Sequence, residues 1–162
     1  MITIHPIALS MRAAGLQARG LPPPAAAHLY IGTDDYLLAT DGSQIRAWLR
    51  RRLHMGIWRL ELAPSADALD NVIVGLRVSK LYAEAGGLDT TVRIIDGCEG
   101  PLQAIKRRIE AGTPAAQALE VLTLQSAAHH LDELLPGIPD ADLVCAYVLD
   151  QELRSKAQET KQ

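Results

Sequence analysis

Short apolar runs alternate with amphipathic segments from His28 onward, and this alternation constrains the fold more than any other feature of the chain. Strands that alternate with helical segments are typical of parallel strands joined by helical crossovers. The sequence therefore predicts a single α/β domain, with helices layered around a mainly parallel sheet and a short helical segment before it. Strands are expected at residues 29–32, which could extend through 36–40, and at residues 57–62, 91–95, 119–124 and 143–149.

Four helices are predicted because each carries both a start and a stop signal. They begin at Ser43, Ser65, Pro101 and Ser126 and end near Gly56, Gly86, Gly112 and Leu135. The first of them places Trp48 on its apolar face. Residues 113–125 are open to two interpretations. The run VLTL before a polar Gln-Ser pair favours a strand, whereas Thr113 as a cap and Pro114 at the first position favour a helix.

The predicted domain organisation follows from one proline-rich stretch and one polar end. Residues 1–20 are expected to form an N-terminal strand and helix segment, and residues 21–27 contain three prolines that predict a stiff connector. The α/β core is expected at residues 28–149. Residues 150–162 are polar throughout, which predicts a frayed helix or a disordered tail.

The composition predicts a folded cytoplasmic protein. Hydrophobic residues make up 48% and charged residues 22% of the 162 residues, which is close to an average globular domain. Only two cysteines are present, which favours a reducing compartment over a disulfide scaffold. The first residues lack the basic region of a signal peptide, and no uncharged apolar run approaches the roughly 18 residues of a membrane span. No membrane association is expected.

A cluster of basic residues lies on both sides of Gly56, where the helix that begins at Ser43 is predicted to end. It consists of Arg46, Arg50, Arg51, Arg52 and Arg59, with Trp48 and Trp58 among them and no acidic residue between Ser43 and Leu60. Guanidinium groups beside aromatic rings suit phosphate contact and base stacking, which predicts nucleic-acid binding. The alternative is a solvated helix face on which late arginines complement the helix dipole.

Charge is also segregated along the chain. No Lys or Arg lies between Arg108 and Arg154, whereas eight acidic residues do. Because such an acidic third would repel phosphate, the chain is poorly suited to indiscriminate nucleic-acid binding. Opposite patches on one subunit instead favour docking to a protein partner or self-association.

Two predicted strand-to-helix loops are candidate ligand sites, since ligands bind at such loops in open α/β sheets. They contain Asp41 and Ser43 in the first loop, and Asp96 and Cys98 in the second. The Gly-flanked Cys98 is expected to be exposed and to react with thiol reagents, whereas Cys145 in an apolar run is expected to be buried. The neighbouring Asp96 and Glu99 argue against a catalytic thiolate at Cys98.

The remaining motifs favour a non-enzymatic protein. His129 and Glu133 have the i, i+4 spacing of a metal pair, but no further ligand stands at a zinc-type spacing. The chain has no GxxxxGK[ST], GxGxxG or GxSxG motif. No catalytic residue, metal or cofactor is therefore predicted. The leading hypothesis is an accessory or adaptor protein, followed by a nucleic-acid-associated protein and then by a small enzyme or ligand-binding domain.

Overall fold

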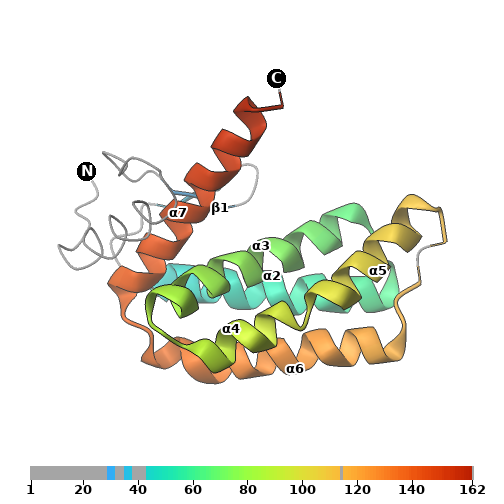
Figure 1. Cartoon of the computed structure of the whole chain (residues 1–162), viewed down its shortest axis with the longest axis horizontal. Helices are drawn as coiled ribbons and strands as arrows, with labels where there is room; N and C mark the ends of the chain where they lie inside the picture. Colours follow the sequence, from blue (N-terminus) through green and yellow to red (C-terminus); the bar gives the residue numbers. More distant parts are fainter. Residues whose placement is uncertain (1–28, 32–34, 38–42, 114, 162) are drawn as a thin grey trace. The chain divides into compact units, whose positions relative to one another are not determined.

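The protein is almost entirely helical in the part that the structure describes, and the predicted α/β fold is wrong. The computed structural model describes residues 29–31, 35–37, 43–113 and 115–161 (Figure 1). The elements are β1 Leu29–Ile31, β2 Asp35–Leu37, α2 Ser43–Leu62, α3 Ala66–Ala85, α4 Asp89–Asp96, α5 Glu99–Glu110, α6 Ala118–Leu134, the 3-10 helix Leu135–Gly137 and α7 Asp140–Glu159.

The predicted strands fail because short apolar runs fit a buried helix as well as a strand. The runs at 57–62, 91–95, 119–124 and 143–149 lie in α2, α4, α6 and α7. At residues 113–125 the helical alternative is the correct one from Ala118 onward. Among the described residues, strands occur only at the prediction for 29–32 and at its extension to 36–40. They are two strands and not one, since β1 pairs with β2 in an antiparallel hairpin, with Tyr30 opposite Tyr36.

The chain divides into two compact units. The bundle unit comprises residues 49–137, and the terminal unit comprises residues 1–48 and 138–162. In the bundle unit, α2 from Leu49, α3, the pair α4 and α5, and α6 run alternately up and down, as antiparallel legs joined by short connections (Figure 1). Its core is aliphatic and is centred on Leu53, Val72, Ile105, Leu124 and Leu131.

Local signals set the ends of two bundle helices. The Ser65 hydroxyl accepts a hydrogen bond from the Ala68 amide at 3.2 Å, and Gly86 follows the last turn of α3. At the start of α6, Gln117 and Glu120 form a capping box, in which the Glu120 carboxylate accepts from the Gln117 amide at 2.9 Å. The hydrogen bonds at these helix termini join residues that are close in the sequence. The predicted helix start at Ser65 is confirmed.

The predicted helix end at Gly56 is wrong, because this glycine lies inside α2 at its contact with α3. A Cβ at Gly56 would lie 2.7 Å from Val72 Cγ2 and 3.2 Å from the Ala68 carbonyl oxygen. At Gly75 of α3, a Cβ would lie 2.9 Å from the Leu53 side chain of α2. Two glycines therefore let the two helices approach closely.

The terminal unit contains the first turns of α2 and the whole of α7. Trp48 packs edge-on against Tyr147, with ring centroids 4.9 Å apart and an interplanar angle of 79°. Trp48 is 5% exposed, which confirms its predicted place in the core. Residues 143–150 of α7 are all buried, and the helix continues through the predicted polar tail to Glu159.

The N-terminal segment 1–20 and the proline connector 21–27 lie outside the described residues. In the part of the chain that the structure describes, no helix is long and apolar enough to cross a membrane.

Candidate interaction surface

Three of the five clustered arginines bind groups of their own chain. Arg46 donates to the Asp140 carboxylate and to the Ile138 carbonyl oxygen. Arg50 Nε lies 3.2 Å from Asp132 Oδ1. Arg52 Nη1 donates to Asn71 Oδ1 on α3 at 2.8 Å, in a further contact between α2 and α3. Three of the five arginines are therefore engaged in contacts within the protein.

The other two arginines accompany an exposed apolar row on α2. Met55, Trp58 and Leu62 are 44%, 52% and 64% exposed. Their i, i+3, i+7 spacing places them on one face of the helix. Arg51 stands one turn before Met55, and Arg59 stands one turn after it; both are exposed. We call these five residues the α2 stripe. Within the described residues, neither arginine forms an ion pair.

The two tryptophans of α2 have different surroundings. Trp48 belongs to the core face of α2, whereas half of the Trp58 surface remains in contact with solvent. Helical periodicity already predicted Trp48 in the core and left Trp58 among the arginines, but Met55 and Leu62 were not predicted as part of a surface. A helical wheel gives a signal for them, because Met55, Trp58 and Leu62 fall outside the inward face formed by Leu49, Leu53 and Leu60.

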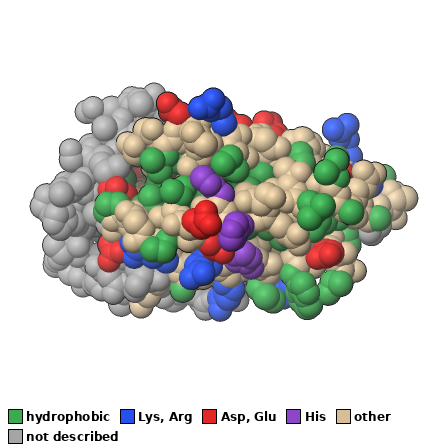
Figure 2. Space-filling model, turned by 90° about the horizontal axis from the view of Figure 1, so that it is seen from below, with side chains coloured by type: hydrophobic (Ala, Val, Ile, Leu, Met, Phe, Trp, Pro, Cys, Tyr) green, Lys and Arg blue, Asp and Glu red, His purple; other side chains and the backbone are tan. Residues whose placement is uncertain are grey.

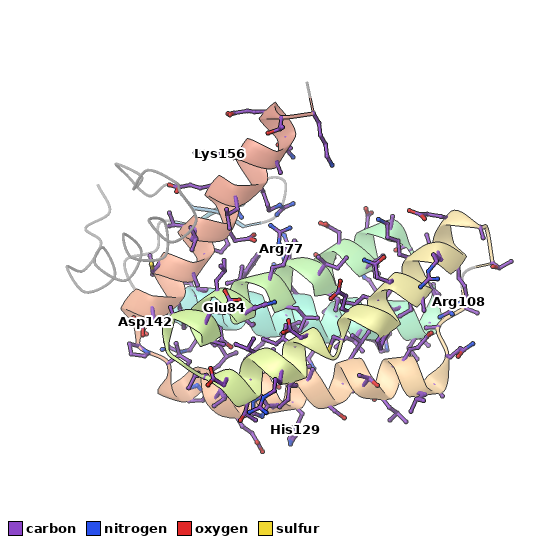
Figure 3. All side chains as sticks on the ribbon, in the orientation of Figure 1. Arg77, Glu84, Arg108, His129, Asp142 and Lys156 are labelled. Atoms are coloured by element: carbon purple, nitrogen blue, oxygen red, sulfur yellow. The ribbon has the colours of Figure 1, made fainter. Side chains whose placement is uncertain are left out.

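Some of the acidic residues that follow Arg108 in the sequence pair with basic residues from earlier in the chain. Asp132 accepts from Arg50 and lies 2.6 Å from His54 Nε2 through its second oxygen. Arg108, labelled in Figure 3, pairs with Glu120 and donates to the Ala115 carbonyl oxygen at 2.7 Å. The segregated charges of the sequence therefore meet within the fold.

His129 and His130 of α6 contact other side chains and do not form a metal centre with the described residues. His129 on α6 lies 3.3 Å from Glu133, and His130 Nε2 lies 3.0 Å from Thr91 Oγ1 on α4. Figure 2 shows histidine side chains beside acidic and basic ones on the face seen there. No group of three or more ligating side chains is placed to hold a metal among the described residues.

The second predicted loop site is a two-residue turn between two helices, and no strand precedes it. Asp41 lies outside the described residues, and Ser43 is the first residue of α2. Asp96 is the last residue of α4, and its carboxylate lies 2.6 Å from Lys80 Nζ. Cys98 stands at the junction of α4 and α5, where its thiol donates to the Ile94 carbonyl oxygen at 3.5 Å. The predicted exposure of Cys98 is wrong, because it is fully buried.

Cys98 is expected to resist thiol reagents in the folded protein. Burial raises the pKa of its thiol to about 11, so that the reactive thiolate is scarce at neutral pH. Incubation with an aromatic disulfide reagent at pH 8 should label Cys98 only after denaturation, and Cys145, also buried, should behave alike. Rapid stoichiometric labelling of Cys98 in the native protein would contradict its placement between α4 and α5.

The chain was compared with known proteins at the level of sequence and of structure. A scan against models of protein families and searches of curated proteins and of solved structures found no match. The α2 stripe therefore has to be interpreted from its own chemistry.

Proposed function

We propose that the protein is a non-enzymatic accessory protein that binds a protein partner through the α2 stripe. The exposed row of Met55, Trp58 and Leu62 carries this proposal. Trp, Met and Arg are enriched at protein interfaces, and Trp and Arg dominate their binding energy. A partner that covers the stripe would remove three large apolar side chains from water. We further propose a cytoplasmic location, which the presence of only two cysteines supports.

The charges around the stripe define the complementary surface. Arg51 and Arg59 flank the apolar row, and α2 carries a single acidic residue, Glu61. An acidic surface with apolar side chains at its centre would match both features. The same charges support nucleic acid less well, because Arg46, Arg50 and Arg52 already bind groups of this chain.

The test compares capture by the full chain and by two variants. Immobilised protein is exposed to an extract of the source cells with and without nuclease, and the retained protein is then purified for titration. Trp58→Ala should weaken its binding by about 2 kcal/mol or more, since exposed aromatic anchors dominate interfaces. The matched control is Leu119→Ser, which changes an exposed apolar side chain of α6, 75% exposed, outside the stripe.

Three outcomes separate the candidate functions. Retention of one protein by wild type and Leu119→Ser but not by Trp58→Ala supports the proposal. Equal retention by Trp58→Ala contradicts it. If nuclease releases everything that was captured, and if replacing both Arg51 and Arg59 lowers the salt dependence of binding, the nucleic-acid hypothesis replaces it.

A further inference from the structure

A pocket of about 270 Å³ opens in the bundle unit between α3, α4 and α5. Its floor is aliphatic and is formed by Ile73, Leu76, Ile95 and Leu102. Since a cavity of about 150 Å³ holds a benzene molecule, this pocket has room for a phenyl ring or a branched aliphatic group. A ligand that fits this pocket would therefore place an apolar group on the floor.

The rim of the pocket carries opposite charges on its two sides. Arg77 and Lys80 come from α3, whereas Asp96 and Glu99 come from α4 and α5. Figure 3 labels Arg77 on α3. Lys80 Nζ and Asp96 Oδ1 lie 2.6 Å apart, and their side chains are 37% and 50% exposed. The hydrogen bond to Asp96 raises the pKa of Lys80, so its ammonium group is charged at neutral pH.

We propose that this pocket binds a small zwitterion of the α-amino acid class with a large apolar side chain. The ligand carboxylate pairs with the cations of α3, and the ligand ammonium pairs with the carboxylates of Asp96 and Glu99. The side chain lies on the aliphatic floor. This exchange replaces the contact between Lys80 and Asp96 by two contacts of the same kind, and Lys80 also keeps Glu84 at 4.0 Å, so neither rim charge loses its partner.

A ligand with a single charge fits this rim less well. An anion that reaches Lys80 lies close to the carboxylates of Asp96 and Glu99, and a cation that reaches Asp96 lies close to the ammonium of Lys80. Like charges near one another repel. An anion that takes Lys80 leaves Asp96 without its rim partner, whereas a cation that takes Asp96 leaves Lys80 only the longer contact with Glu84 at 4.0 Å. The rim therefore favours a ligand that carries both a positive and a negative charge over a ligand that carries only one of them.

Three probes with the same aromatic ring test this discrimination on the full chain. Phenylalanine is the zwitterion, phenethylamine the cation and 3-phenylpropionate the anion, and each is titrated by calorimetry at neutral pH. Phenylalanine should bind saturably with a dissociation constant below about 5 mM. It should bind about fivefold or more tightly than either singly charged probe. No saturable binding up to about 5 mM, or equal binding of a singly charged probe, would overturn the proposal.

Variants locate the binding within the pocket. Ile73 is a half-buried residue of the floor, and its replacement by tryptophan should fill the pocket and abolish phenylalanine binding. Asp96→Asn changes an exposed side chain, so folding is retained, and should weaken binding about fivefold. Trp58→Ala on the α2 stripe is the control and should leave the affinity unchanged. If Trp58→Ala abolishes binding while Asp96→Asn does not alter it, the ligand sits elsewhere.

Discussion

Replacing Trp48 with alanine is expected to lower the free energy of unfolding by about 3 to 5 kcal/mol. The indole is 5% exposed and packs edge-on against Tyr147 of α7, so its removal loses both burial and an aromatic contact. Urea unfolding followed by circular dichroism at 222 nm measures the change without relying on tryptophan fluorescence.

The second tryptophan provides the control for this experiment. Trp58→Ala removes the same side chain from an exposed position and should change the free energy of unfolding by no more than about 0.5 kcal/mol. The assignment of the two faces of α2 would be reversed if Trp58→Ala proved the more destabilising change.

Gly56→Leu is expected to destabilise the bundle unit by about 3 kcal/mol or more, through overpacking between α2 and α3. Already the first added carbon would lie 2.7 Å from Val72 Cγ2 and 3.2 Å from the Ala68 carbonyl oxygen. The backbone oxygen cannot move without displacing α3. Chemical denaturation of the purified variant measures the loss.

The matched control is Gly100→Leu in α5, where an added Cβ would meet nothing within 4 Å beyond its chain neighbours. Helix propensity favours leucine over glycine, but the Pro101 ring that follows disfavours a helical residue with a Cβ, so this variant should change the free energy of unfolding by no more than about 1 kcal/mol in either direction. A loss at Gly100 equal to that at Gly56 would show that the effect is unrelated to close helix packing.

The candidate surface was only partly predictable from the sequence. The basic cluster is visible in the sequence, but the partners of Arg46 and Arg50 lie 94 and 82 residues further along the chain. No local pattern identifies such pairs. The exposure of Trp58 and the rim of the pocket likewise depend on which helix faces the neighbouring helices cover.

Features that depend on near neighbours in the chain are predictable from the sequence. The start of α3 at Ser65 rests on a bond to an amide three residues away, and the inward face of α2 follows from helical periodicity. Whether the apolar runs at 57–62 and 119–124 form strands or helices depends on the packing of distant segments. Gly56, which resembled a helix end, is instead a packing contact with Val72. A short apolar run satisfies either backbone, and only the surfaces that bury it select one.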